Sequence, residues 1–162
     1  MKNIKLKKFH DLIRKCNNFK RFLKDNILQD IYRQNKAVLE NQGTNNYGDG
    51  QSFTENNLEW QLFKSENTGK DIILDGQNVK VKSDEVMRFT DRLYNALSGD
   101  NKKDMNIEIT GQNNNNMKVT CNVPYYAVHH NGENNMPVRK AFFAGQNQIE
   151  KWKEMLHKYI LD

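Results

Sequence analysis

The residue types best suited to chemistry in this sequence are its four histidines, His10, His129, His130 and His157. The run His129-His130-Asn131 has side chains that could ligate a metal ion in a nuclease or act in proton transfer. A metal site needs three or four converging ligands, and the only histidine after Asn131 is His157, in a segment with amphipathic helical spacing. We therefore expect no metal site and interpret His129 and His130 as structural.

Other catalytic signatures are missing from the sequence. It has no Gly-rich phosphate-binding loop, no serine in a nucleophile elbow and no poised pair of carboxylates. The two cysteines, Cys16 and Cys121, are far apart in apolar segments, which excludes a disulfide scaffold and a cysteine-based zinc module. We interpret both as small core side chains. We expect a protein that is not an enzyme and that uses no cofactor and no metal.

Four aromatic residues cluster late in the sequence: Tyr125, Tyr126, Phe142 and Phe143. Aromatic side chains beside basic ones can stack the bases of single-stranded nucleic acid, but they also commonly anchor cores and interfaces. The net charge of +5 permits contact with nucleic acid and does not require it. A basic nucleic-acid-binding protein therefore stays open as an alternative function.

The elements that must position these residues fit into one domain, because the chain has 162 residues. No stretch approaches the roughly 20 apolar residues of a membrane span. No apolar run follows the basic N-terminus, so we expect no secretory signal and no contact with a membrane. We expect a single domain over residues 1–162, made in the cytoplasm.

Apolar residues recur at spacings of three and four across residues 4–39, which predicts amphipathic helix over this whole length. A helix so long needs a break, for which Asn17-Asn18 is suited, or a part that projects from the body. Lysines and arginines fill its other face. We interpret that face as solvated, with contact to a membrane surface or nucleic acid as the alternative.

Glycines and asparagines predict a loop over residues 41–57, while the state of residues 58–63 stays open. An Asp-Gly pair between short apolar runs predicts a hairpin over residues 72–81. Ser83 is suited to cap the next helix, and Gly99 is suited to end it.

Alternation of apolar and polar residues predicts strands over residues 105–110 and 117–123, joined in a hairpin by a turn at the asparagine run 113–116. An apolar stripe over residues 149–160 predicts a C-terminal helix. The order of helix, hairpin, helix, hairpin and helix predicts an α+β fold in which helices pack on an antiparallel sheet.

The segment 126–145 holds the most specific pattern of the sequence. In order, its residues are Tyr126-Ala127-Val128-His129, Gly132, then Pro137, Arg139, Phe142-Phe143 and Gly145 before the last helix. This pattern resembles the C-terminal signature of the tailed-phage virion morphogenesis or tail-completion family, the head–tail joining proteins. The run from Arg92 to Ser98 is similar to a helical segment of that family, without its leading glycine.

The sequence departs from the family pattern at three places. Lys140-Ala141 stands in place of the second proline and adds one residue, and Asn131 stands where an aromatic residue is common. The region 41–82 is longer than the family's linker. The resemblance is therefore firm from Arg88 onward and loose before it.

The resemblance implies a structural virion protein that forms a closed homo-oligomeric ring at the head–tail joint, without catalysis. Its partners would be further copies of itself, portal or tail proteins of the same virion, and the DNA that passes through the lumen. It would reside in the virion after assembly in the host cytoplasm. The chain would then divide into a helical arm (1–40), a variable insertion (41–82) and an α+β core (83–162).

The resemblance also implies interface and structural roles for a set of loop residues: Tyr126, His129, Gly132, Pro137, Arg139, Phe142, Phe143 and Gly145. Pro137 fixes φ, and the two glycines permit backbone geometry that other residues avoid. Arg139 is suited to a carboxylate or to main-chain carbonyls of a neighbour. We expect His129 to lock the loop through a hydrogen bond.

Overall fold

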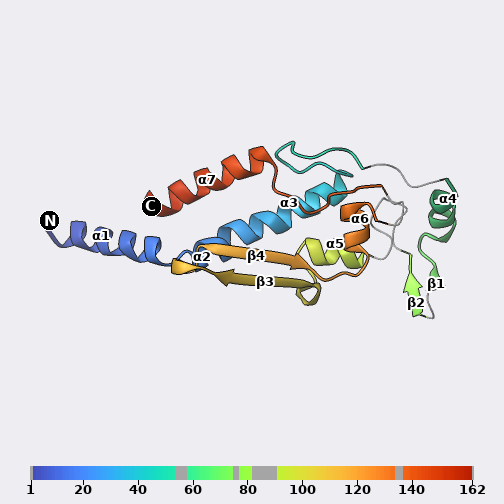
Figure 1. Ribbon diagram of the computed structural model, residues 1–162, viewed down its shortest axis with the longest axis horizontal. Coiled ribbons are helices and arrows are strands. Elements are labelled where there is room, and N and C mark those ends of the chain that lie inside the picture. Colours follow the sequence, from blue (N-terminus) through green and yellow to red (C-terminus); the bar gives the residue numbers. More distant parts are fainter. Residues whose placement is uncertain (1, 54–57, 75–76, 82–90, 134–136, 162) are drawn as a thin grey trace.

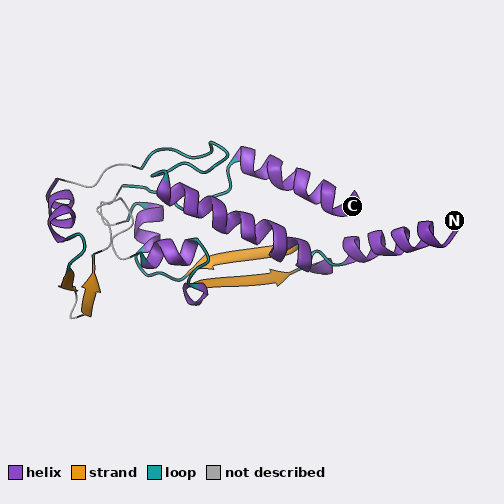
Figure 2. Ribbon diagram, turned by 180° about the vertical axis from the view of Figure 1, so that it is seen from behind, coloured by secondary structure: helices purple, strands orange, loops and turns teal. Residues whose placement is uncertain are grey.

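The structure of the protein is a computed structural model that describes residues 2–53, 58–74, 77–81, 91–133 and 137–161 (Figure 1). Helices pack on an antiparallel hairpin, so the α+β fold predicted from the sequence is confirmed. Figure 2 shows the long helices on one side of the central hairpin, with α1 extending beyond the body.

The helices of the described residues are α1 (Lys2–Asn17), α2 (Lys20–Phe22), α3 (Leu28–Glu40), α4 (Leu58–Asn67), α5 (Arg92–Leu97), α6 (Tyr126–Asn131) and α7 (Gln146–Leu161). Short irregular turns are the π-helical η1 (Leu23–Ile27) and the 3₁₀ turns η2 (Lys102–Asp104) and η3 (Gln112–Asn114). The strands are β1 (Asp71–Leu74), β2 (Gln77–Lys80), β3 (Met105–Thr110) and β4 (Asn116–Cys121). They form two separate antiparallel hairpins, β1–β2 and β3–β4.

The helix predicted for residues 4–39 is broken at Asn18 and Phe19, one residue beyond the expected place. The side chain of Asn18 accepts a hydrogen bond at 3.0 Å from the amide of Lys20, the first residue of α2. From α2 the chain continues through η1 to α3. The amide of Phe19 donates to the carbonyl of Asn113, in the β3–β4 turn, at 2.9 Å. These bonds fix the point at which α1 leaves the body.

Within residues 1–40, α1 extends beyond the end of the β3–β4 hairpin (Figures 1 and 2), and the division of the chain into an arm (1–40), an insertion and a core stays a prediction. From Leu28 onward the same segment is a central helix of the core, and Leu39 and Val38 are among the most buried residues of the described chain. Sequence spacing did not separate the two parts, because a projecting helix and a packed helix can share one amphipathic pattern.

The main core joins α3 to α5, to the hairpin and to the chain before α7. Its buried side chains are Leu28, Tyr32, Val38, Leu39, Leu93, Ala96, Leu97, Met105, Val123 and Ala141. A second cluster, of Phe22, Ile27 and Ile31, lies nearer to α1, and half-buried side chains of β4 and α7 pack against it. Removal of this apolar surface from water is the main favourable contribution to folding.

The β3–β4 hairpin confirms the prediction of two strands joined by the asparagine run. Met105 pairs with Cys121 and Thr110 pairs with Asn116 in antiparallel register. The hairpin side chains that pack on the main core are Ile107, Met117, Val119 and Cys121. Asn113 and Asn114 have positive φ angles, which asparagine tolerates better than most residues.

The structure also describes parts of the predicted hairpin over residues 72–81 and of the predicted helix that ends at Gly99. The hairpin β1–β2 pairs Leu74 with Gln77, and the two residues between them lie outside the described residues. Gly99, at φ +85°, follows α5 and ends it as predicted, but the expected start at Ser83 lies outside the described residues. Helix α4 settles the open state of residues 58–63, and α6 was not predicted.

The predicted loop 41–57 is confirmed over its described residues 41–53, and polar contacts tie it to α7. The carboxylate of Asp49 accepts hydrogen bonds from the amides of Asn147 at 3.1 Å and Gln148 at 2.9 Å. It therefore caps the N-terminus of α7, where free amides and the helix dipole both favour an anion.

A buried carboxylate on α3 holds the other side of α7. Asp30 is 1 % exposed and accepts hydrogen bonds from the side chains of Arg33, Gln34, Tyr47 and Trp152. Burial by itself would raise the pKa of Asp30, but these donors together hold that pKa below its usual value. The indole of Trp152 donates at 2.7 Å, so α7 is fixed against α3 by a charge-assisted hydrogen bond.

Candidate functional site

Residues 126–145, the signature segment, connect β4 to α7 and do not begin as a loop. Their first part is α6, a helix too short to leave a periodic signal in the sequence. Gly132 ends α6 at φ +72°, which agrees with the freedom expected of it. Tyr126 packs on the main core, its hydroxyl lies 2.9 Å from Nδ1 of His130, and burial raises the pKa of Tyr126.

The two halves of the signature segment meet at His129 and Arg139. The amide of Arg139 donates to the carbonyl of His129 at 2.7 Å, and Nη1 of Arg139 lies 3.3 Å from Nδ1 of the imidazole. Because a guanidinium can only donate, Nδ1 is the acceptor and the proton of the neutral ring is on Nε2. His129 therefore locks this segment through hydrogen bonds, as the sequence led us to expect.

Arg139 is buried within its own chain, with 1 % of its surface exposed. Burial lowers the pKa of Arg139, yet a guanidinium stays charged in proteins. The expectation that Arg139 reaches a carboxylate or carbonyl of a neighbour does not fit this placement. Its guanidinium instead contacts the imidazole of His129, on α6 of the same chain.

His129 lies close to two buried cations. Burial lowers the pKa of His129, and the charges of Arg139 and Lys64 lower it further. Lys64, on α4, is itself 1 % exposed. His129 is therefore neutral at physiological pH, as its role as acceptor requires. Lys64 could not be predicted as a neighbour of His129, because it precedes His129 by more than 60 residues in the chain.

The residues in the second half of the signature segment differ in burial and in backbone geometry. Pro137 is half-buried, whereas Phe142 and Phe143 pack against the main core. We expected glycine at position 145 because of its backbone freedom. Gly145 does not have a positive φ, so its backbone conformation does not require glycine. Instead, a Cβ there would overlap the side chain of Asp49, which caps α7.

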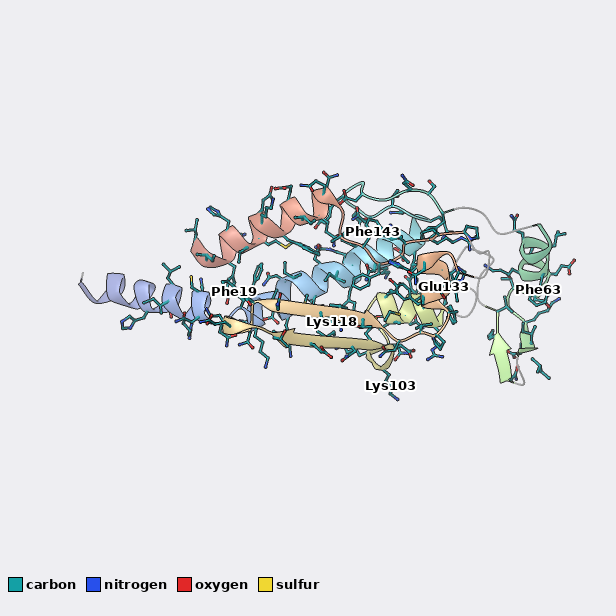
Figure 3. All side chains as sticks on the ribbon, in the orientation of Figure 1. Phe19, Phe63, Lys103, Lys118, Glu133 and Phe143 are labelled. Carbon is teal, nitrogen blue, oxygen red and sulfur yellow. The ribbon has the colours of Figure 1, made fainter. Side chains whose placement is uncertain are left out.

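An apolar groove of about 580 Å³ lies beside the signature segment. Its walls are the second core cluster, strand β4, the Phe142–Ala144 stretch and helix α7. The residues that line it are Phe22, Leu23, Ile27, Ile31, Asn115, Asn116, Met117, Val119, Phe142, Phe143, Ala144, Ile149, Trp152, Lys153 and Leu156. In Figure 3, Phe19 lies toward the α1 end of this region and Phe143 toward the other end.

The described residues contain no group of three His, Cys, Asp or Glu side chains that could hold a metal ion. Within the same part of the chain, no helix combines the length and the apolar character needed to cross a bilayer. Cys16 and Cys121 are free thiols and only half-buried, although Cys121 does pack on the main core.

Comparison with known proteins gives no further assignment. No family model, no curated protein and no solved structure matches this chain. Function is therefore argued from the residues and their arrangement, since an α+β fold alone is compatible with many functions.

Proposed function

We propose that this protein is a structural component of a tailed-phage virion and forms a closed ring of identical subunits at the head–tail joint. The observation that carries the proposal is the signature segment, whose residue pattern resembles that of the head–tail joining proteins. Its two halves are separated in sequence by a polar gap and are joined by His129 and Arg139. These contacts hold the described parts of the segment, residues 126–133 and 137–145, against each other.

The surface of the chain also suits assembly. The groove beside Phe142 and Phe143 is open and mostly apolar, which is typical of a surface that another protein covers. Heterologous contacts between identical subunits generate a ring when the rotation between them closes. A groove that accepts a different part of the next copy is a contact of this kind.

The proposed mechanism is templated assembly, and it needs neither catalysis nor a cofactor. One face of the ring docks on the preceding ring, formed by the portal or by a tail protein, and the other face receives the next component. The proposed location is therefore the neck or tail of the virion, reached after assembly in the host cytoplasm. DNA would pass through the lumen of the ring.

Native mass spectrometry of the purified full-length chain, with negative-stain electron microscopy of the same sample, tests the proposal. We expect a single closed ring with one copy number. A chain that remains a single subunit at the highest soluble concentration, alone and with portal or tail proteins of its phage, would contradict the ring.

One observation favours a second function, that of a nucleic-acid-binding protein. Helix α1 has six basic residues and one acidic residue, a net charge equal to that of the whole chain. A projecting basic helix is suited to the phosphate backbone. This function predicts that the isolated chain binds duplex or single-stranded nucleic acid with an affinity that falls steeply with salt, whereas weak salt dependence would count against it.

A further inference from the structure

We propose that strand β4 of one subunit pairs with strand β3 of the next copy of this chain, so that the hairpins of neighbouring subunits join in one antiparallel sheet. This inference rests on the proposed ring and names the contact that would form it.

The register of the β3–β4 hairpin determines which main-chain groups point outward. The amide of Asn122 donates to the carbonyl of Asp104 at 2.7 Å, and these two residues are the next pair in the register that joins Met105 to Cys121. Hydrogen-bonded and non-hydrogen-bonded pairs alternate along an antiparallel ladder. The amides and carbonyls that point away from the partner strand are therefore those of Met105, Ile107 and Ile109 on β3 and of Met117, Val119 and Cys121 on β4.

These outward groups form two open edges. Among the described residues, no hydrogen bond from outside the hairpin reaches the main chain of Met105–Thr110 or Asn116–Cys121. Each strand has six residues and no proline. Open edges of this kind are templates for pairing, and proteins commonly cover them. The partner that satisfies a row of outward amides and carbonyls is another extended strand.

A second copy of the chain presents such a strand in the required direction. Strands β3 and β4 are antiparallel within the hairpin. When a rotation places two hairpins side by side with the same orientation, β3 of one copy therefore lies antiparallel to β4 of the other. The contact joins two different edges, so it is heterologous and repeats until the ring closes. A closed ring then leaves neither edge open.

The surroundings of the two strands suit this pairing. The apolar groove borders β4 at Met117 and Val119 and has α7 on its other side, so the space beside the hairpin lies next to β4. On β3, Ile107 and Ile109 are only half-buried, and Ile109 is not among the side chains that pack on either apolar cluster of the described chain. Residues opposite each other in a sheet project on the same face. Pairing would therefore bring these two isoleucines to the groove side of the neighbouring β4.

One register pairs all of the outward residues, and it also matches charges. It places Val119 opposite Ile107 of the next copy, as in the hairpin itself, and therefore places Lys118 opposite the next copy's Glu108. Glu108 and Lys118 are both exposed and already face each other within the hairpin. The assembled sheet would have a row of alternating opposite charges, and such cross-strand pairs are stabilising.

Charge reversal in separate subunits of the full-length chain tests the pairing. Glu108→Lys makes both positions basic and Lys118→Glu makes both acidic, so each variant repels its own copies at every contact. A mixture of the two variants restores opposite charges wherever unlike subunits meet. We expect each variant alone to need about tenfold more protein than wild type to form rings in native mass spectrometry, and the equimolar mixture to recover assembly.

The mixture also controls for folding, because each subunit in it keeps its own pair of like charges. Lys36→Glu on α3 and Glu133→Lys after α6 make the same charge changes at exposed positions outside the hairpin, and both should form rings as wild type does. Wild-type assembly of Glu108→Lys and Lys118→Glu would overturn the inference. So would a mixture that assembles no better than either variant alone.

Hydrogen exchange separates failure of this inference from failure of the proposed function. We expect peptides from β3 and β4 to exchange more slowly in the wild-type ring than in single subunits of Lys118→Glu, because the outward amides gain acceptors. A ring in which these peptides exchange as fast as in single subunits overturns the strand pairing but leaves the ring. A wild-type chain that never assembles overturns both.

Discussion

His129 and Arg139 are joined twice, once through the main chain at 2.7 Å and once between the guanidinium and the imidazole at 3.3 Å. The first bond ties α6 to the irregular stretch that leads to α7. The second places a charged, fully buried side chain against a neutral ring. Together the two bonds connect the α6 part of the signature segment to the part that precedes α7.

We predict that His129→Ala and Arg139→Ala are coupled in stability. Arg139→Ala removes a buried side chain and its hydrogen bonds and should lower the free energy of unfolding by about 3 kcal/mol, because buried charged groups are held by networks. The double variant should be less destabilised than the sum of the single variants by about 1 kcal/mol. Urea denaturation of the four proteins measures this difference, and strict additivity would contradict the contact.

Stability should fall as the pH is lowered from neutral toward about 5. The folded state holds the pKa of His129 below the ordinary value of 6.5, through burial and the charges of Arg139 and Lys64, and burial likewise lowers the pKa of His130. Below pH 6.5 these histidines bind more protons in the unfolded chain than in the folded chain. The free energy of unfolding therefore decreases as the pH falls.

The control for this pH dependence is His129→Gln, which retains an acceptor for Arg139 but cannot be protonated. Its urea midpoint should decrease less between neutral and acid pH than that of wild type. Equal decreases in the two proteins would show that His129 does not cause the dependence.

Asp49→Ala should destabilise the protein by about 1 kcal/mol through loss of the cap on α7. Gly145→Ala should cost at least as much, because its Cβ must displace the Asp49 side chain. When Asp49 is already alanine, the added effect of Gly145→Ala should shrink. Thermal denaturation of the three variants measures these effects, and an undiminished effect in the double variant would argue against the close approach.

Tyr32→Phe should stabilise the protein by about 1 kcal/mol. The hydroxyl of Tyr32 is buried and has no hydrogen-bond partner among the described residues, so the folded state bears its desolvation without compensation. The ring, which lies against Gly99, is retained in phenylalanine. A loss of stability in chemical denaturation would mean that the hydroxyl does have a partner.

Elements with a strong local signal could be predicted from the sequence. The alternation in β3 and β4, the asparagine turn, the stripe of α7 and the terminating Gly99 all depend on neighbours within a few residues. Helix α6 could not be predicted in this way because it has six residues. The burial of Arg139, which keeps it from contacting a neighbouring subunit, depends on packing between segments far apart in the chain.

The candidate site was predicted in part. His129 as a lock and Gly132 as a helix end followed from residue type and position. The groove beside Phe142 and Phe143 could not be predicted from local patterns, because the second core cluster, β4 and α7 form it together from distant parts of the chain. The close approach that requires Gly145 likewise involves Asp49, almost 100 residues earlier.

The central claim is that this chain is a ring component of the virion neck or tail. The most direct measurement is quantitative mass spectrometry of purified particles of the source phage, which gives the copy number of this chain relative to the portal protein. We predict a fixed ratio, equal to that of the portal or to half of it. Absence of the chain from purified particles would contradict the claim and would favour the nucleic-acid-binding function.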